Sequence, residues 1–155
     1  MNYSIQNMTQ KNALIIANEW RYSDDYSFYN IDADLEDYEE FIDIKKRGDS
    51  YYQVLLDGDL VGFLSYTVND VIADIGIGLK PELTGQGLGS SYLQACMEFL
   101  ILKHKDIKEI TLSVASFNER AIKLYEKLGF TKTKSFNQPT NGGIYPFISM
   151  KKIIK

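Results

Sequence analysis

The sequence predicts a mixed α/β fold, in which a central and mostly antiparallel sheet of about seven strands is flanked by about four helices. Three observations predict this fold class: residues 51–79 read as an antiparallel meander, residues 71–114 read as strand, helix and strand, and a hairpin closes the chain after residue 130. Antiparallel strands can be joined by a tight turn, whereas parallel strands need a long crossover. One sheet should therefore contain both kinds of pairing.

Two helices are predicted near the N-terminus, after a short strand at 3–7. Thr9 can cap a helix that runs to about Trp20, because its hydroxyl can accept a bond from an N–H group of the first turn. Residues 34–44 predict a second helix, and Gly48 follows it as a stop signal. Both segments repeat apolar residues at helical spacing. The predicted buried stripes consist of Ala13, Leu14, Ile16 and Ala17 in the first helix, and of Leu35, Tyr38, Phe41 and Ile42 in the second.

Three strands should follow, at 51–56, 60–68 and 71–79. Asp57-Gly58 separates the first two, and this dipeptide favours a two-residue hairpin because both of its positions accept positive φ angles. The third run is short and apolar, and it can return beside the second. The three strands are therefore expected to form the meander.

The second half of the chain predicts the crossover and the closing hairpin. A helix over 88–103 links the third meander strand to a short strand at 110–114, and such a unit should be parallel and right-handed. A further helix covers 118–128, and Gly129 stands where a left-handed C-terminal cap belongs. Phe130 can then fold back onto the last turn of this helix. The final hairpin is predicted over 130–136 and 144–152.

Composition is that of an ordinary globular protein and excludes several functions. The 155 residues fit a single domain over 1–155 with one core, and 45% of them are hydrophobic. A formal net charge of -4 argues against nucleic acid as a partner, because phosphate backbones bind basic surfaces. No apolar run approaches the roughly 20 residues that cross a bilayer, and residues 1–10 lack the features of a signal peptide. Cys96 is the only cysteine, so we expect a cytoplasmic protein, monomeric or homodimeric, without an internal disulfide or a membrane partner.

Residues 84–90 read Thr-Gly-Gln-Gly-Leu-Gly-Ser and lie between a predicted strand and the long helix. Three glycines at alternate positions let the backbone approach a ligand closely, and the turn leads N–H groups to the positive end of a helix dipole. The segment therefore predicts a cradle for phosphate. It differs from a Walker loop, which ends in Gly-Lys-Ser/Thr, and from a Rossmann turn, which opens an alternating unit. The alternative is a flexible turn without a ligand.

Two segments resemble the signatures of the GNAT superfamily of N-acetyltransferases. Residues 79–89 are similar to its pyrophosphate-binding motif, Arg/Gln-x-x-Gly-x-Gly/Ala with a proline upstream, although Thr84 stands where Arg or Gln is usual. Residues 118–130 resemble its second motif. The resemblance covers 71–130 well, the final hairpin loosely, and the N-terminal half only in the order of its elements. The residues at the spacing of the second motif are Asn118, Ala121, Tyr125, Gly129 and Phe130.

The resemblance implies that the chain binds acetyl-CoA and transfers its acetyl group directly to an amine. The amides of the glycine turn would hold the pyrophosphate. The pantetheine arm would pair with the preceding strand, where Gly76 and Gly78 permit close backbone approach. An amide near Ile77 would polarise the thioester carbonyl, as an oxyanion hole does. The implied cofactor-binding residues are Ile77, Gly78, Leu79, Thr84, Gly85, Gln86, Gly87, Leu88, Gly89, Ser90 and Asn118.

Two residues are candidates for proton transfer. By resemblance, Tyr125 is the donor to the departing thiolate, and it shares a helix face with Asn118. An amine of the lysine type has a pKa of about 10.4 and must lose a proton before it attacks. Asp74 stands where family members often carry a carboxylate, and it is the candidate base, acting through water. The alternatives are that Tyr125 is a core aromatic and that Asp74 bonds locally at a strand start. No group of His, Cys and Asp has metal-ligand spacing, so no metal is expected.

The acceptor is expected to bind near residues 22–44, which contain many carboxylates and neither Lys nor Arg. In the GNAT family the region between the first two helices usually lines the acceptor site. Aromatic rings interleave with the start of this run, and rings beside carboxylates suit an ammonium group. The alternative is a solvated acidic helix packed by core aromatics. The candidate acceptor-binding residues are Trp20, Tyr22, Tyr26 and Tyr29.

The leading hypothesis is an N-acetyltransferase that acts on a small-molecule or peptide amine, with a cationic acceptor favoured by the acidic run. A catalytically weak acetyl-CoA-binding sensor or interaction module is the alternative, because Thr84 departs from the motif and the base is not settled. Such a module would have no need of a phenol that protonates a thiolate, so Tyr125 argues for the enzyme. A different acyl-CoA transferase or a nucleotide-binding domain forms a third class.

Overall fold

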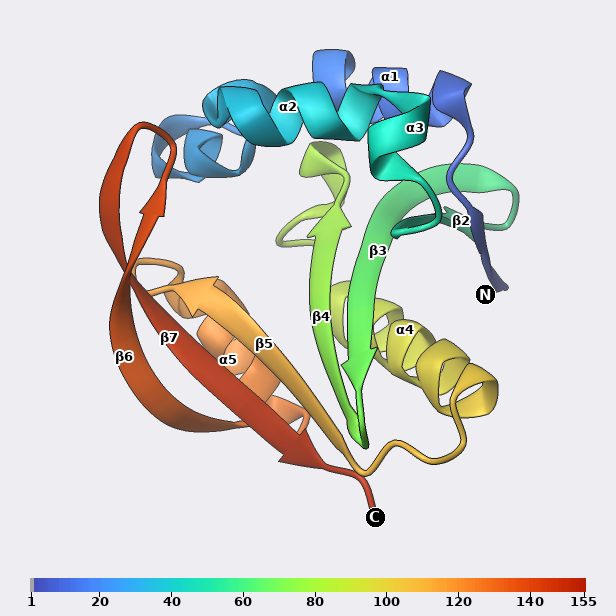
Figure 1. The fold of residues 1–155 in the computed structure, drawn as a ribbon, viewed down its shortest axis with the longest axis vertical. Helices are drawn as coiled ribbons and strands as arrows, with labels where there is room; N and C mark the ends of the chain where they lie inside the picture. The colour runs from blue at the N-terminus through green and yellow to red at the C-terminus, as the bar shows by residue number, and fades with distance from the viewer. Residues whose placement is uncertain (1) are drawn as a thin grey trace.

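The computed structural model describes residues 2–155, which form one seven-stranded sheet with helices on both sides (Figure 1). The strand order is β1-β2-β3-β4-β5-β7-β6. Within the described residues only β4 and β5 run parallel, and all other neighbours are antiparallel. The predicted mixed and mostly antiparallel sheet is therefore confirmed. The strands are β1 (Tyr3–Asn7), β2 (Tyr51–Leu56), β3 (Asp59–Asn69), β4 (Ile72–Leu79), β5 (Glu109–Ala115), β6 (Thr131–Thr140) and β7 (Gly143–Ile153).

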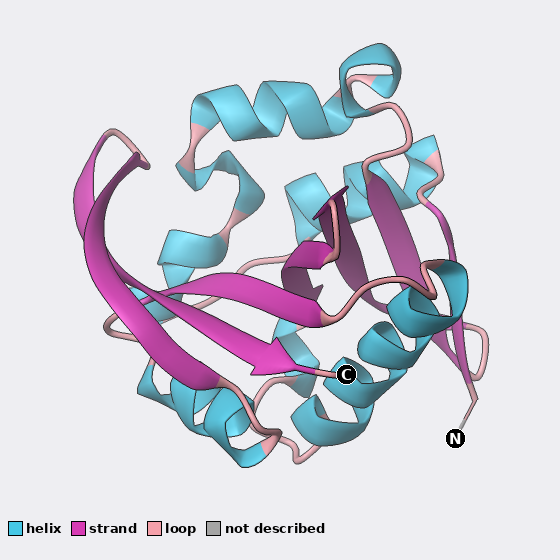
Figure 2. Cartoon of the chain, turned by 60° about the horizontal axis from the view of Figure 1, so that its bottom comes forward, coloured by secondary structure: helices cyan, strands magenta, loops and turns pink. Residues whose placement is uncertain are grey.

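Helices cover the sheet in two layers, with α4 and α5 on one face and α1, α2 and α3 on the other side (Figure 2). Each layer has its own hydrophobic cluster. Leu64 belongs to the cluster under α4, whereas the adjacent Phe63 packs against the cluster of α1 and α2, because successive strand residues point to opposite faces. The helices are α1 (Gln10–Glu19), α2 (Leu35–Ile42), α3 (Ile44–Arg47), α4 (Gly89–Lys103) and α5 (Glu119–Lys127), with short 3₁₀ helices η1 (Asp24–Tyr29), η2 (Ile31–Ala33) and η3 (Pro81–Leu83).

Two turns have the backbone geometry that the sequence predicts. Asp57 and Gly58 form the two-residue link between β2 and β3, with φ angles of 50° and 90°. Gly129 has a φ of 100° after α5, and the N–H of Phe130 donates to the carbonyl of Tyr125 at 2.9 Å. This pattern is a left-handed helix cap in which the chain folds back on the last turn. Phe130 is accordingly buried and packs beside Tyr125.

The prediction of one helix over residues 34–44 is wrong in its extent, because α2 ends at Ile42. Asp43 adopts an extended backbone and its carboxylate accepts from the N–H groups of Lys45 and Lys46, so the chain stops one helix and starts another at this residue. Leu35 is also 72% exposed and Leu14 40% exposed, although both were expected in buried stripes. Helical spacing alone does not reveal how wide a face the neighbouring sheet can cover.

The β6–β7 hairpin extends past the sheet, and its tip reaches the segment before α2 (Figure 1). The N–H of Asn141 donates to the carboxylate of Asp34 at 3.0 Å, and its side-chain amide donates to the carbonyl of Phe28 at 2.9 Å. Bonds from the backbone N–H groups of Asp37 and then Asn141 lower the pKa of Asp34. Asp34 therefore caps α2 and anchors the hairpin tip at the same time.

Candidate functional site

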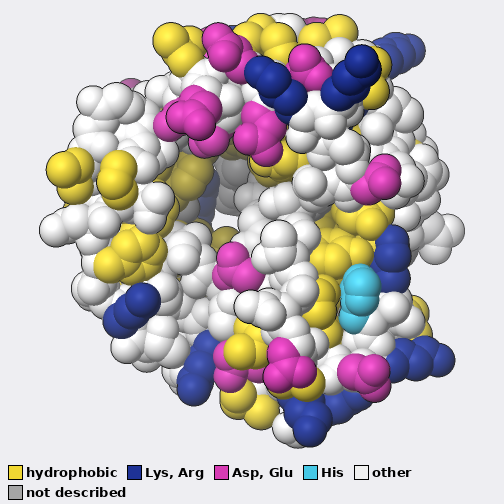
Figure 3. Space-filling model, viewed as in Figure 1, with side chains coloured by type: hydrophobic (Ala, Val, Ile, Leu, Met, Phe, Trp, Pro, Cys, Tyr) yellow, Lys and Arg dark blue, Asp and Glu magenta, His cyan; other side chains and the backbone are white. Residues whose placement is uncertain are grey.

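The parallel strands β4 and β5 pair over only part of their length. Their register ends at Ile75, which lies opposite Leu112. Beyond this point β4 continues to Leu79 and β5 continues to Ala115 without pairing to each other. The strands separate into a wedge, and a cavity of about 390 Å³ lies between them. Figure 3 shows this face hollowed, with acid side chains gathered over α2 at the rim.

Most residues that the sequence singled out meet at this cavity. Its walls are the free half of β4 (residues 76–79, beyond the pairing with β5), the end of β5, the glycine turn, α5 and the tyrosine-rich segment 22–29. Five candidates lie outside its lining, namely Trp20, Asp74, Gln86, Leu88 and Ser90. The candidates in its lining are Tyr22, Tyr26, Tyr29, Ile77, Gly78, Leu79, Thr84, Gly85, Gly87, Gly89, Asn118 and Tyr125.

The glycine turn has a backbone that suits an anion. Gly85 and Gly87 have φ angles of 72° and 79°, which side chains rarely adopt, and a Cβ on Gly87 would meet no atom within 4 Å. Gly89 is needed for a different reason, because a Cβ there would lie 2.8 Å from Leu124 on α5. Leu88 precedes α4 without a side-chain cap, so the first N–H groups of this helix are free for a ligand. These features fit the phosphates of a CoA ligand.

Thr84 contributes its hydroxyl to the turn itself. Its Oγ1 donates to the carbonyl of Pro81 at 2.7 Å, and its N–H lies 3.2 Å from the same oxygen. The side chain that departs from the family motif is therefore occupied by a local bond. Any anion bound here depends on backbone N–H groups or on a cation from another element.

Tyr125 faces the cavity from α5. Its side chain is 9% exposed, and its phenol has no hydrogen-bond partner among residues 2–155. Burial, with smaller contributions from Tyr29 and Cys96, raises the pKa of this phenol, so it keeps its proton at neutral pH. A protonated and unpartnered hydroxyl at a cavity wall can donate to a ligand. Packing against Phe130 at 5.9 Å between ring centroids shows that the ring is also part of the core.

Asn118 has two contacts that fix the start of α5. Its Oδ1 accepts from the N–H of Ala121 at 3.2 Å, which makes it the N-cap. Its Nδ2 donates to the phenol oxygen of Tyr29 at 3.0 Å. The same side chain therefore caps α5 and connects it to the tyrosine-rich segment.

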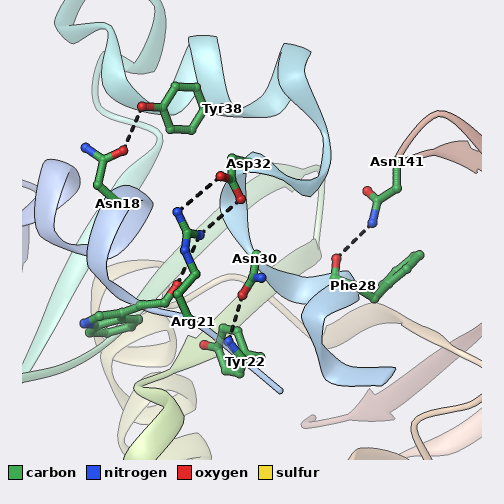
Figure 4. A network of polar contacts seen from close by, with 9 residues as sticks. Asn18, Arg21, Tyr22, Phe28, Asn30, Asp32, Tyr38 and Asn141 are labelled. Atoms are coloured by element: carbon green, nitrogen blue, oxygen red, sulfur yellow. Dashed lines mark hydrogen bonds and ion pairs between the residues drawn. The ribbon is translucent and has the colours of Figure 1, made fainter. Parts of the chain in front are cut away.

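The tyrosine-rich segment packs against the end of β4 and the start of α5. Tyr22 donates from its phenol to the carbonyl of Leu79 at 2.5 Å, and its N–H donates to Asn30 at 2.8 Å (Figure 4). Burial raises the pKa of this phenol, as does the nearby charge of Glu82. Tyr26 has the guanidinium of Arg120 over its ring at 4.5 Å. The three tyrosines thus contact β4 and the start of α5, and all three line the cavity.

Trp20 is a correction to the predicted acceptor site. It is 4% exposed and packs in the cluster of α1 and α2 with Ile16 and Phe41. The indole lies at the end of α1, where the amphipathic stripe of that helix meets the sheet. Its aromatic character therefore serves the core, which sequence spacing alone could not distinguish from a ligand contact.

Asp74 lies just below the wedge, one pair before the last parallel pair, opposite Thr111. Its carboxylate is exposed and accepts a bond from Thr111 Oγ1 at 2.7 Å. This bond joins the two strands where they begin to separate. Asp74 does not line the cavity, so a role as base requires a bridging water.

Replacement of Asp74 by asparagine separates the two roles of this residue. If the carboxylate accepts the amine proton, Asp74→Asn is expected to lower kcat and to change its dependence on pH on the acid side. Thr111→Val is the matched control, because it removes only the inter-strand bond. Equal losses of melting temperature in both variants with unchanged kcat would leave Asp74 a structural link.

Arg120 and Tyr92 are among the cavity-lining residues that the sequence analysis does not name. Arg120 lies on the first turn of α5 and is exposed. Tyr92 is fully buried on α4, and its phenol lies 2.9 Å from the carbonyl oxygen of Phe63 and 2.7 Å from that of Gly78. Tyr92 therefore binds both β3 and β4 at the end of β4 that β5 does not pair with. The position of Tyr92 on the apolar stripe of α4 could have predicted that this side chain is buried, whereas nothing in the sequence relates Arg120 to the glycine turn.

The acidic run has several structural duties. Asp32 forms two bonds with the guanidinium of Arg21, both at 3.1 Å (Figure 4). Asp34 and Asp43 cap helices. Asp24 and Asp25, which are exposed at the start of η1, and the acids of α2 form no such bond among residues 2–155.

Comparison with known proteins shows which family the sequence of this chain matches. The model of the acetyltransferase (GNAT) family matches residues 15–130. Mycothiol acetyltransferase from Acidimicrobium ferrooxidans is 38% identical over 80 residues, which are 48% of this chain and 25% of that protein. A putative ribosomal protein bS18-alanine N-acetyltransferase from Bacillus subtilis is 33% identical over 94 residues, 52% of this chain and 61% of that protein. The chain thus covers less than two thirds of either relative.

Solved structures share the fold. The aminoglycoside acetyltransferase AAC(6')-Ib, solved in complex with coenzyme A, has a TM-score of 0.76 to this chain at 20% identity. The alignment covers 98% of this chain and 95% of that one. No helix among residues 2–155 is long and apolar enough to cross a membrane.

Proposed function

Because the chain belongs to the acetyltransferase (GNAT) family, we propose that it transfers the acetyl group of acetyl-CoA to a primary amine by direct attack in a ternary complex. The observation that carries this proposal is the wedge between β4 and β5. Its walls bring together the free half of β4, a glycine turn whose backbone has positive φ angles, and the protonated phenol of Tyr125.

The residues present fit acetyl-CoA at each of its parts. N–H groups around Gly85, Gly87 and the start of α4 would hold the pyrophosphate. Beyond Ile75, β4 pairs with β3 on one side and has no strand neighbour on the β5 side, so the backbone groups that point to the β5 side can bind the pantetheine amides. Tyr92 and Tyr22 support this stretch by binding the carbonyls of Gly78 and Leu79.

The proposed reaction forms one bond from nitrogen to carbon and breaks one bond from carbon to sulfur. Acetyl-CoA supplies the activated acetyl group as a thioester. An ammonium acceptor loses one proton before it attacks, for which Asp74 is the candidate acceptor through water, and its nitrogen loses a second proton as the amide forms. The sulfur gains a proton from Tyr125, whose phenolate is reprotonated from solvent, so that one net proton is released in each turnover. Cys96 is fully buried, and its burial raises the thiol pKa to about 12, so it does not suit an acyl-cysteine route.

The acceptor is proposed to be a small-molecule or peptide amine that reaches the wedge past the segment 22–29. The names of two similar proteins include an amine acceptor. The acceptor is an alanine of ribosomal protein bS18 in one name and an aminoglycoside in the other. The acids of α2 at the rim of the hollow give this entrance a negative potential, which favours a cationic amine (Figure 3).

Acetyl-CoA consumption with a panel of amines tests the proposed function. Polyamines, aminoglycosides, amino acids and N-terminal peptides are each mixed with acetyl-CoA, and the released thiol is measured with the N-acetyl product by mass spectrometry. At least one amine is expected to give both products in equal amounts. Tight CoA binding without turnover on any amine would favour the alternative, a sensor or interaction module that binds acetyl-CoA.

Neutralising Asp24 and Asp25 together is expected to raise the KM of a cationic acceptor and to leave CoA affinity unchanged. These exposed carboxylates act through attraction that salt screens, so the effect should shrink at high ionic strength. Asp49→Asn with Asp106→Asn is the control, because it changes net charge equally at exposed sites outside the acidic segment 22–44. An equal rise of KM in both double variants would mean that net charge alone matters.

A further inference from the structure

The cavity is poor in charge for a site that would hold a phosphorylated ligand. Arg120 is the one charged residue among those that line it in the described chain. The nearest cation to the glycine turn in sequence is Lys80, and it is paired with Glu82 at 3.5 Å. Thr84 adds no charge, and its hydroxyl is bound to Pro81. Backbone N–H groups offer partial charges only, so the phosphates need a full cation from elsewhere.

Arg120 stands where such a cation is needed. Its Nη1 lies 3.5 Å from the position that a Cβ would take on Gly85. The guanidinium forms no ion pair with a carboxylate among residues 2–155. It is therefore free to bind an anion beside the turn. A guanidinium also presents paired N–H groups that match two phosphate oxygens, which an ammonium group cannot do.

Tyr26 holds this arginine in place. The ring lies 4.5 Å from the guanidinium carbon and packs beside Phe117 at 5.9 Å between centroids. A long side chain that stacks on a fixed ring loses less conformational freedom when it binds a ligand. Tyr26 thus connects the segment 22–29 to the guanidinium of Arg120 at the turn.

We propose that Arg120 is a binding residue for the pyrophosphate of acetyl-CoA, held beside Gly85 by the ring of Tyr26, which acts as a positioning residue. The proposal rests on the proposed function, because it assumes that CoA occupies the wedge. It assigns the cationic part of phosphate recognition to α5 rather than to the turn. The ligand chemistry is a diphosphate ester, and Arg120 contacts this group rather than the 3′-phosphate because it lies at the turn.

Calorimetry with CoA, dephospho-CoA and pantetheine tests the role of Arg120. Arg120→Gln is expected to weaken CoA and dephospho-CoA binding alike, by about 10- to 100-fold, as for the loss of charged hydrogen bonds. The affinity for pantetheine, which lacks the pyrophosphate, should be the same in this variant as in the unaltered protein. Lys123→Gln is the matched control, because it removes the same charge one turn along α5 outside the cavity lining.

The outcomes separate this inference from the proposed function. Absence of CoA binding by the unaltered protein would contradict the proposed function itself. CoA binding that Arg120→Gln and Lys123→Gln weaken equally, or that neither weakens, would overturn the role of Arg120. A loss confined to CoA, with dephospho-CoA unaffected, would place Arg120 at the 3′-phosphate and would overturn the assignment to the pyrophosphate.

The positioning role of Tyr26 has a separate readout. Tyr26→Phe keeps the ring and should keep CoA affinity, whereas Tyr26→Leu is expected to weaken it by about two- to fivefold. In the Arg120→Gln background the leucine variant should add no further loss, because the ring then has no cation to hold. A full additional loss in that background would show that Tyr26 acts independently of Arg120.

Discussion

Tyr125→Phe is expected to lower kcat by roughly 10²–10⁴-fold, the range typical of general acids. The substitution keeps the ring and its packing on Phe130 and removes only the hydroxyl. Acetyl-CoA affinity should change little, because the lost interaction belongs mainly to the transition state. The measurement is kcat with a saturating acceptor, alongside CoA affinity and melting temperature on the same variant.

Burial raises the pKa of Tyr125 above that of an ordinary phenol, which is itself protonated at neutral pH, so the proton stays on this group over the whole range of a practical assay. Tyr38→Phe is the control, since it removes a phenol bonded to Asn18 on the outer helices (Figure 4). A normal kcat with a lowered melting temperature in Tyr125→Phe would make this residue a core aromatic only.

Gly87→Val is expected to weaken CoA binding by at least about 100-fold, because several charged hydrogen bonds to the phosphates depend on the turn. A φ of 79° is strongly disfavoured for a β-branched residue, so the backbone N–H groups must turn away. The added Cβ meets no atom within 4 Å, so crowding is not the cause of the loss. Calorimetry with CoA measures the effect.

Gly58→Val provides a matched control for backbone strain. Gly58 has a φ of 90°, a Cβ there also meets nothing within 4 Å, and it lies in the hairpin between β2 and β3. Both variants should lose about 1–2 kcal/mol of stability from the left-handed conformation. Only Gly87→Val should lose CoA affinity. Equal CoA affinities in the two variants would mean that the turn is a loop without a ligand.

Local chemistry made much of the fold predictable. Asp57-Gly58 specifies its turn through φ angles that few residues accept, and Gly129 specifies the end of α5 in the same way. The parallel pairing of β4 with β5 followed from the helix that joins them. These are features that a short stretch of sequence determines without help from distant residues.

Non-local packing decided what the sequence left open. Trp20 and Tyr22 look alike as aromatics near acids, yet one is buried between helices and the other binds the carbonyl of Leu79. The contact of Arg120 with Gly85 and Tyr26 joins segments that are far apart along the chain. Asp74 is the candidate base by resemblance, but its exposure and its bond to Thr111 depend on where β4 and β5 separate. A linear pattern contains none of this information.

The structure of the complex with CoA tests the central claim most directly. We expect the pantetheine arm along the free half of β4, the pyrophosphate at Gly85 and Gly87, and the sulfur within hydrogen-bond distance of the phenol of Tyr125. Electron density for CoA in the wedge with the sulfur at Tyr125 would support the proposed acetyl transfer. CoA bound elsewhere, or a sulfur that Tyr125 cannot reach, would contradict it.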